Sequence, residues 1–455
     1  MVQIDEKNYG VSKARLSSLF DAGTFVELSA YLKHSDSQDE LAGVVCGYGV
    51  VNGALAFAFL QDSGRTKGAF GERQAKKIAS LYALAVKNGA PVIGVFDSAG
   101  AVVYDGASAL AAYGTLMKHI SDASGVVPQI AVIDGICGGA SAVAASMFDF
   151  VVTIKKTSEF FVSAPFTVGK TEGAAAQGLS AYEAETEAEA FGFVKELLAT
   201  LPQNNADNAY FENDDDLNRK ISFDPASYQS EELLATLADG GRFTRLYADY
   251  TENALFGFAT FGGALAGVIA CNPAKKGILD IRTAKAAAKL IGFCDAFSIP
   301  VLTLVDSEGL DASADAENAA YASELARLAM AYTSSENAKL TVVLGKAYGT
   351  AFTLLGSKSV GADMALALPT ACISVLSPEA SVAFVWNDRV GEVSREELEK
   401  EWKEKCASAA SACDAGEIDD VIEPAELRQR ICASLAMLSA KAEGVPARKR
   451  TGLPL

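Results

Sequence analysis

Two adjacent glycines, Gly138 and Gly139, lie where an apolar run ends and a segment of small residues begins. Glycine permits a tight turn and lets a ligand approach the backbone closely. If a helix starts here, its first N–H groups are unpaired and lie at the positive end of the helix dipole. Such donors can stabilise negative charge on a carbonyl oxygen and form an oxyanion hole. Close backbone packing also explains a glycine pair, and these two residues alone leave both interpretations open.

A second turn of this kind occurs later in the chain. Gly349 follows another apolar run and precedes Thr350 and Ala351. Small residues allow the same use of backbone N–H groups, although the β-branched Thr350 restricts the backbone and adds bulk. The chain has only two histidines, His34 and His119. Because histidine is the side chain best suited to acid–base work near neutral pH, we expect chemistry that depends on backbone groups instead.

The elements that position these turns repeat along the chain. Gly53 and Gly263, which are 210 positions apart, each begin the sequence Gly-Ala-Leu-Ala. Apolar runs that begin at Pro91 and Pro300, 209 positions apart, both end in an Asp-Ser-x-Gly turn. Helical segments are expected at 79–90 and 288–299, and further buried strands at 129–134 and 340–344. Short apolar runs alternating with helical segments are typical of α/β folds. The nearly constant offset indicates two α/β domains related by internal duplication.

The segment 203–216 separates the two halves. It is polar and acidic and has no hydrophobic period, which is typical of a surface loop or linker. We therefore predict domains at 1–220 and 221–455. With 455 residues the chain is long enough for each domain to bury its own core.

Composition limits the classes of function. Half of the residues are hydrophobic and 21% are charged, which is a globular composition. A net charge of −18 argues against nucleic-acid binding, which needs a basic face, although a local basic cluster can still bind an anionic ligand. The eight cysteines form no C-x-x-C pair, so we expect reduced thiols and no metal site. Without a signal peptide or a long apolar stretch, we expect a cytoplasmic protein.

Longer motifs follow one another in a recognisable order. In the first half they are 97–101 (DSAGA), 124–130 (SGVVPQI), 138–140 (GGA) and 149–152 (DFVV). In the second half they are 277–281 (GILDI), 293–300 (FCDAFSIP), 346–349 (KAYG) and 368–371 (LPTA). At the two ends they are 15–16 (RL), 23–28 (GTFVEL) and 418–424 (IDDVIEP). This series resembles the carboxyltransferase family of propionyl-CoA and acetyl-CoA carboxylases over nearly the whole chain.

The resemblance implies a crotonase-like spiral of ββα units (the ClpP/crotonase fold) in each half. It also implies a homo-oligomer, with a hexamer built as a trimer of dimers, and an active site where the first half of one subunit meets the second half of another. By match of position, Gly138 and Gly139 would stabilise the enolate of an acyl-CoA thioester. Thr350 and Ala351 would polarise the ureido carbonyl of carboxybiotin. The ureido nitrogen of biotin can take the substrate proton, so no histidine is needed.

Further binding residues are predicted around these turns. The candidates for the CoA phosphates form a basic cluster: Arg65, Lys67, Arg73, Lys76 and Lys77. A solvated helix face explains the same residues equally well. The remaining predicted binding positions are Ala99, Gly100, Gly349 and Thr353, of which Thr353 lies where the family varies its acyl pocket.

The chain departs from the family pattern in several places. Where the family reads D-S-G-G-A-R-I-Q-E-G, residues 97–106 read DSAGAVVYDG and lack the arginine and one glycine. The family's R-H-G-A-K stretch is replaced by an expected amphipathic helix at 317–331, and the first half is shortened after 160–165. A specialised substrate, a decarboxylating role and weakened catalysis all remain open.

Missing motifs indicate partners. The chain has neither an Ala-Met-Lys-Met biotin-attachment sequence nor a Gly-rich ATP-binding region. We therefore expect biotin on a separate biotin carboxyl carrier protein, together with either a biotin carboxylase or membrane decarboxylase subunits. The expected function is a carboxyltransferase subunit that moves a carboxyl group between carboxybiotin and a short-chain acyl-CoA. The alternatives are the corresponding subunit of a sodium-pump-coupled decarboxylase, a biotin-independent crotonase, and a degenerate scaffold subunit.

Overall fold

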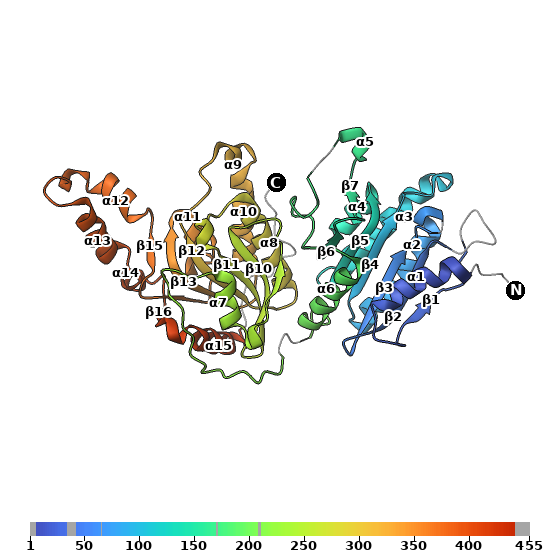
Figure 1. Ribbon diagram of the computed structural model, residues 1–455, viewed down its shortest axis with the longest axis horizontal. Coiled ribbons are helices and arrows are strands. Elements are labelled where there is room, and N and C mark those ends of the chain that lie inside the picture. The colour runs from blue at the N-terminus through green and yellow to red at the C-terminus, as the bar shows by residue number, and fades with distance from the viewer. Residues whose placement is uncertain (1–5, 34–41, 65, 170–171, 208–210, 442–455) are drawn as a thin grey trace. The chain divides into compact units, whose positions relative to one another are not determined.

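The computed structural model describes residues 6–33, 42–64, 66–169, 172–207 and 211–441. The chain forms two compact units, Met1–Asn208 and Ala209–Leu455, each with its own sheet and helices (Figure 1). The polar segment 203–216 is divided between them. The Asn205 N–H donates to the Val126 carbonyl (3.1 Å) in the first unit, and the Phe211 N–H donates to the Gly263 carbonyl (2.7 Å) in the second. These contacts explain why the units divide before the predicted boundary near residue 220.

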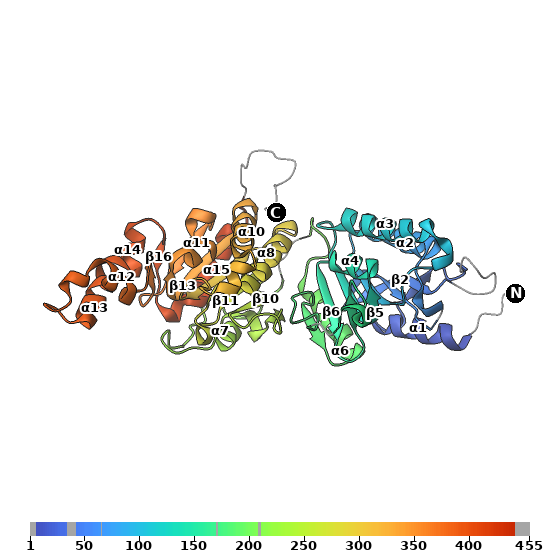
Figure 2. The same ribbon diagram turned by 90° about the horizontal axis from the view of Figure 1, so that it is seen from above.

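The first unit contains one sheet with helices on both faces. Its strands are β1 (Val26–Leu28), β2 (Val44–Val51), β3 (Ala54–Gln61), β4 (Val92–Ser98), β5 (Gln129–Gly138), β6 (Phe150–Ile154), β7 (Glu159–Phe161) and β8 (Tyr182–Ala184). Its helices are α1 (Glu6–Ser18), α2 (Glu72–Asn88), α3 (Ala107–Ala123), α4 (Ala140–Ser146), α5 (Pro165–Val168) and α6 (Glu187–Thr200). The sheet order is β1-β2-β3-β4-β5-β6-β8, and β7 pairs with the end of β5. Figure 2 shows α2 and α3 on one face of this sheet and α1 and α6 on the other.

The second unit repeats this arrangement. Its strands are β9 (Thr244–Leu246), β10 (Ala254–Phe261), β11 (Ala264–Cys271), β12 (Val301–Ser307), β13 (Lys339–Tyr348), β14 (Met364–Ala367), β15 (Cys372–Ser374) and β16 (Asp420–Val421). Its helices are α7 (Ser230–Leu237), α8 (Ile281–Ala296), α9 (Ala314–Asn318), α10 (Tyr321–Ser334), α11 (Gly349–Leu354), α12 (Pro378–Val385), α13 (Arg395–Cys406), α14 (Ala409–Asp414) and α15 (Leu427–Leu438). The sheet order is β9-β10-β11-β12-β13-β14-β16, and β15 pairs with β13.

The two sheets correspond strand by strand, irregularities included. The pairing of β4 with β5 shifts register between Phe96 and Ser98. The pairing of β12 with β13 shifts between Val305 and Ser307, 209 positions later. Two units with the same strand order and the same bulge confirm the predicted α/β fold of two domains related by internal duplication.

The repeated Gly-Ala-Leu-Ala sequence marks a hairpin turn in each unit. Asn52 and Gly53 join β2 to β3 with φ angles of 50° and 83°, and Gly262 and Gly263 join β10 to β11 with φ angles of 63° and 84°. A two-residue hairpin with positive φ at both positions matches the right-handed twist of the strands, and glycine adopts it without strain. The repeat therefore reports the chemistry of a turn as well as common ancestry.

One predicted helix is wrong. The single amphipathic helix expected at 317–331 is divided into α9 and α10, because Ala320 adopts a left-handed conformation with φ 57°. The hydroxyl of Ser313 accepts a hydrogen bond from the Ala316 N–H and caps the short α9. The apolar period of this segment continues across the break, so it gave no signal of the interruption.

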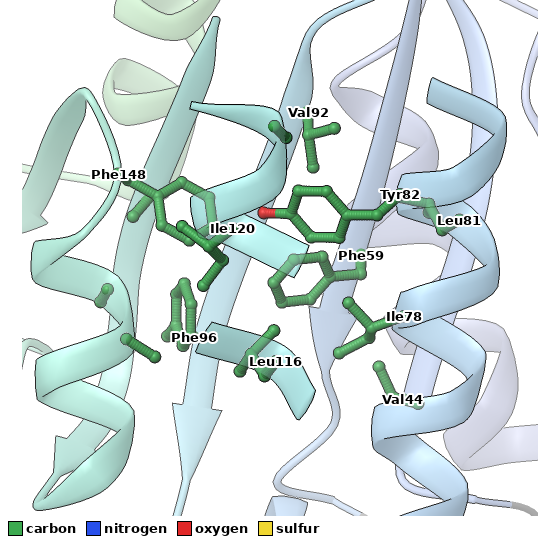
Figure 3. Packing of buried hydrophobic residues seen from close by; sticks show 14 of the residues in the cluster. Val44, Phe59, Ile78, Leu81, Tyr82, Val92, Phe96, Leu116, Ile120 and Phe148 are labelled. Carbon is green, nitrogen blue, oxygen red and sulfur yellow. The ribbon is translucent and has the colours of Figure 1, made fainter. Parts of the chain in front are cut away.

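The core of the first unit lies between its sheet and the pair α2 and α3. Figure 3 shows Phe59, Phe96 and Phe148 packed edge to face there, with ring centroids 5.5 and 5.6 Å apart. Each such buried side chain contributes about 1.5–3 kcal/mol relative to exposure. The hydroxyl of Tyr82 donates to the Gln129 Oε1 (2.9 Å), which gives each of these two buried side chains a polar partner. The core thereby fixes β4 and β5, whose ends carry the first turn.

A fully buried arginine holds together the second unit. The Arg428 side chain, on α15, is 0% exposed and lies 2.7 Å from the Asp239 Oδ1 and 3.2 Å from the Asp215 Oδ2. It also donates to the carbonyl oxygen of Leu237, the last residue of α7. The Asp239 carboxylate in turn accepts the N–H groups of the hairpin turn at Gly262 (2.9 Å) and at the residue after it (2.8 Å). This network joins the segment after the unit boundary, α7, α15 and the β10–β11 hairpin.

We predict that Arg428→Met lowers the free energy of unfolding of the second unit by about 3–5 kcal/mol, because it leaves the buried Asp239 carboxylate without its counter-charge. Both tryptophans, Trp386 and Trp402, belong to this unit, so tryptophan fluorescence in urea reports its unfolding. The matched control is Arg430→Met, which removes a partly exposed ion pair with Asp420 and should cost less than about 1 kcal/mol. Equal losses in the two variants would contradict the structural role of Arg428.

Candidate active site

The turn at 98–100 follows β4 and is held by hydrogen bonds from its own N–H groups. The Gly100 N–H donates to the Ser98 Oγ (3.2 Å), and the Ala99 N–H donates to the Lys67 carbonyl (2.9 Å). Ala99 and Gly100 were predicted as cofactor-binding positions. Both N–H groups already have acceptors in the protein. A ligand would therefore have to contact Ala99 and Gly100 through atoms other than these N–H groups.

Gly138 ends β5, and Gly139 forms the bend into α4. Gly139 has φ 58° and ψ −123°, a conformation that residues with a Cβ atom rarely adopt. Its N–H donates to the Phe161 carbonyl in β7 (2.9 Å). Successive N–H groups of an extended strand point to opposite edges, so the Gly138 N–H faces β4, where Ser98 is paired with Cys137. The two predicted glycines therefore differ: the Gly138 N–H faces β4, and the Gly139 N–H holds the bend.

The Asp97 carboxylate holds the irregular end of β5. It accepts hydrogen bonds from the Ile136 N–H (3.3 Å) and from the Ser63 hydroxyl. A Cβ atom on Gly135 would collide with this carboxylate, which explains the glycine there. Burial raises the pKa of Asp97 above its ordinary value. Asp97 thus bridges β4 to the bulge of β5 and fixes the position of the strand that ends in Gly138.

Asp306 does the same in the second unit. Its carboxylate accepts hydrogen bonds from the Lys346 N–H (2.8 Å) and from the Tyr228 hydroxyl (3.0 Å). Gly345 lies against it, as Gly135 lies against Asp97. Burial again raises the pKa of the carboxylate. The same interaction therefore fixes the strand that leads to the second turn.

The second turn opens onto a cavity of about 370 Å³. The cavity is lined by the turn at 308–310, by the start of α11 at 348–350, and by residues 375–377 with Ala380. Gly349, predicted as a binding position, and Thr350, predicted as catalytic, both line this cavity. Ala351 is fully buried behind them, and Thr353 is exposed on α11 but is not one of the lining residues.

Strand pairing sets the correspondence between the two turns. Gly138 is paired with Phe161, and Tyr348 is paired with Ser374 at the equivalent place. Gly139 and Gly349 then coincide, and both have φ 58°. The pair predicted in the second half, Thr350 and Ala351, therefore lies further into its helix than the glycine pair of the first half.

Sequence reasoning missed Glu308. Its side chain lines the cavity and lies 2.6 Å from the Lys346 Nζ and 3.6 Å from the Lys276 Nζ. The hydrogen bond to Lys346, assisted by the nearby charges, lowers the pKa of Glu308 below its ordinary value. The available signal was the 209-residue offset, which places this acid opposite Ala99 of the first half.

The basic cluster predicted for the CoA phosphates is only partly exposed. Arg65 lies outside the described residues. Lys67 is exposed beside the turn at 98–100, and Arg73 is exposed on α2. Lys76 is exposed but lies 2.5 Å from the Glu72 carboxylate one helical turn away. Lys67 and Arg73 are therefore the members of the described cluster that are best placed for an anion.

Lys77 has to be removed from this cluster. Its side chain is buried, and its Nζ donates to the Val44 carbonyl (2.9 Å) and lies 3.9 Å from the Glu27 carboxylate. The helix places Lys77 on the face of α2 that packs against β2 and β3, whereas its sequence neighbour Lys76 faces outward. Sequence spacing alone did not distinguish the two.

Other reactive residues lie away from both turns or are buried. Within the described residues no group of three or more His, Cys, Asp or Glu side chains is placed to hold a metal ion. The His119 ring stacks on Tyr82, with centroids 6.4 Å apart. Burial raises the pKa of Cys46 to about 12, so this thiol is protonated and unreactive at neutral pH. No helix in the described part of the chain is both long and apolar enough to cross a bilayer.

Known proteins match this chain over almost its full length. The carboxyl transferase domain family matches residues 6–453. The propionyl-CoA carboxylase carboxyltransferase subunit of Haloferax mediterranei is 32% identical, with 99% of this chain and 94% of that protein covered. The methylmalonyl-CoA decarboxylase subunit alpha of Propionigenium modestum is 34% identical, with 98% and 93% covered.

A solved structure agrees with the fold. The hexameric transcarboxylase 12S, determined with methylmalonyl-coenzyme A and methylmalonic acid bound, superposes with a TM-score of 0.91 at 29% identity, covering 98% of this chain and 92% of that one. The two-domain crotonase-like architecture expected from the sequence is thereby confirmed. The chain belongs to the carboxyl transferase domain family.

Proposed function

We propose that this chain is the carboxyltransferase subunit of a biotin-dependent acyl-CoA carboxylase or decarboxylase. It moves a carboxyl group between carboxybiotin and a short-chain acyl-CoA. The observation that carries the proposal is the pair of equivalent turns, at Gly139 and Gly349, each preceded by a carboxylate-held strand. Two such turns in one chain suit a reaction that passes through two carbonyl oxygens, one on each reactant.

At the first turn the reactant is the acyl-CoA thioester. Removal of its α-proton places negative charge on the thioester oxygen, and only interactions that strengthen as this charge develops accelerate the step. We assign the donor for this oxygen to the backbone of the turn at Gly138 and Gly139. Gly139 sets the bend that holds this donor in place. Lys67 and Arg73, with Arg65, would attract the phosphates of CoA.

At the second turn the cavity suits the ureido ring of biotin. The ring presents one carbonyl acceptor and N–H donors, and the cavity offers the backbone at Gly349 and Thr350 together with the Glu308 carboxylate. Biotin supplies the carboxyl group and a ring nitrogen that takes the substrate proton. Because biotin itself accepts the proton, the reaction needs no catalytic histidine.

The carboxyl group can move in either direction. Propionyl-CoA carboxylase and methylmalonyl-CoA decarboxylase relatives match this chain almost equally, at 32% and 34% identity. Decarboxylation coupled to a membrane sodium pump is therefore the second candidate. A biotin carboxylase that co-purifies with the chain would indicate carboxylation, and membrane decarboxylase subunits would indicate the reverse.

The subunit is proposed to work in the cytoplasm as a homo-oligomer, a hexamer like transcarboxylase 12S, with a separate biotin carrier protein. Exposed apolar side chains beside both turns support assembly. Val162 and Phe166 of the first unit are 68% and 92% exposed, and Val375 and Phe384 of the second are 81% and 84% exposed. Such patches are characteristic of protein interfaces.

The proposal predicts decarboxylation of methylmalonyl-CoA or malonyl-CoA that depends on added free biotin, which replaces the carrier as carboxyl acceptor. Release of carbon dioxide by the purified full-length chain, followed with and without biotin, measures this. Absence of turnover with every short-chain ester, together with no CoA-ester binding by calorimetry, would overturn the proposal. Turnover that ignores biotin would instead indicate a biotin-independent crotonase.

A second prediction concerns the first turn. Gly139→Ala should lower kcat in this assay roughly 10²–10³-fold, because a Cβ atom at φ 58° distorts the bend and displaces the backbone donors of this turn. The control is Gly114→Ala, within α3, where a Cβ atom meets nothing within 4 Å and kcat should not change. Thermal melts of both variants separate misfolding from lost catalysis. A folded Gly139→Ala variant with wild-type kcat would remove the first turn from the mechanism.

A further inference from the structure

Glu308 is the one charged residue among the described residues that line the cavity at the second turn. Its backbone is fixed, because its N–H donates to the Lys276 carbonyl (2.9 Å) and the next N–H, of Gly309, donates to the Ser307 Oγ (3.3 Å). Its side chain is 29% exposed and is oriented by the ion pair with Lys346. A carboxylate acceptor is thus held on a residue that lines the cavity.

The residue equivalent to Glu308 in the first unit carries no charge. Ala99 lies 209 positions earlier, and its N–H makes the same contact, with the Lys67 carbonyl (2.9 Å). The backbone at Ala99 and at Glu308 therefore makes the same hydrogen bond. The two positions differ in their side chains, because Glu308 has a carboxylate where Ala99 has a methyl group. Because the two units are otherwise equivalent here, this difference in side chain can make the two turns bind different ligands.

The two proposed ligands differ in the group that a carboxylate would recognise. A thioester and its enolate have no N–H donor, and the enolate oxygen is anionic, so an adjacent carboxylate repels it. A cyclic urea presents a carbonyl acceptor flanked by N–H donors. A hydrogen bond from such a donor to a carboxylate is charge-assisted and is stronger than a neutral one.

Building on the proposed function, we propose that Glu308 accepts a hydrogen bond from a ring N–H of the ureido group and makes the second turn selective for biotin over the acyl-CoA enolate. The carboxyl-bearing ring nitrogen has no hydrogen, so the contact falls to the other nitrogen, which keeps its N–H in both forms of biotin. Lys346 and Lys276 flank the single carboxylate with two positive charges, so the anionic form of biotin is not repelled from this cavity.

Glu308→Ala, which copies the first turn, tests the assignment. The dissociation constant of free biotin, followed by ligand-observed NMR titration of the full-length chain, should rise about tenfold or more, as expected for loss of a hydrogen bond to a charged group. The KM for biotin should rise in parallel, and the KM for the acyl-CoA should stay unchanged. Biotin methylated at the ring nitrogen that keeps its hydrogen should bind wild type weakly and should lose little further affinity in Glu308→Ala.

The matched control is Glu252→Ala. Glu252 forms an exposed ion pair with Lys275 (2.5 Å) in the same unit but does not line the cavity, so biotin affinity should be unaffected. If Glu308→Ala leaves biotin binding at the wild-type value while wild type turns over with biotin, this inference fails and the proposed function stands. If Glu308→Ala and Glu252→Ala weaken both substrates equally, Glu308 serves stability only. If wild type neither binds biotin nor depends on it, both proposals fall.

Discussion

Both turns depend on one interaction, in which an aspartate carboxylate accepts hydrogen bonds from the bulge of the neighbouring strand. Asp97 accepts the Ile136 N–H, and Asp306 accepts the Lys346 N–H. Each carboxylate is desolvated, which raises its pKa, and is retained because it satisfies backbone donors that the register shift leaves unpaired. The carboxylates need glycines at their contact points, and they fix where each strand ends and its helix begins.

The two halves share this arrangement of the backbone but differ in the side chains beside it. The bend at Gly139 and the bend at Gly349 have the same φ, so the scaffold delivers similar backbone groups at both places. The residue after the Asp-Ser pair differs, as Ala99 in one half and Glu308 in the other. Duplication supplies two oxyanion-type turns, and a single side chain suffices to give them different ligands, because a carboxylate repels an enolate and attracts an N–H donor.

The second unit relies on a charged centre at Arg428. Arg428 crosses from α15 to Asp239 and Asp215 and draws the segment after the unit boundary onto the sheet. A fully buried arginine is tolerated only with its counter-charges in place. Since the Asp239 carboxylate also receives the N–H groups of the β10–β11 hairpin turn, the same network holds the start of the sheet whose later strands carry the second turn.

The sequence by itself determined the duplication, the family and the positions of both turns, because turn glycines, buried apolar runs and Asp-Ser-x-Gly endings are local patterns with a constant offset. It could not determine where the N–H groups of two adjacent glycines point: strand geometry directs that of Gly138 toward β4 and pairs that of Gly139 with Phe161. It did not separate buried Lys77 from exposed Lys76, or find the break at Ala320. Only the tertiary structure placed Glu308 at a cavity with Gly349 and Thr350, because the cavity walls come from segments about 70 residues apart that meet through β-sheet pairing.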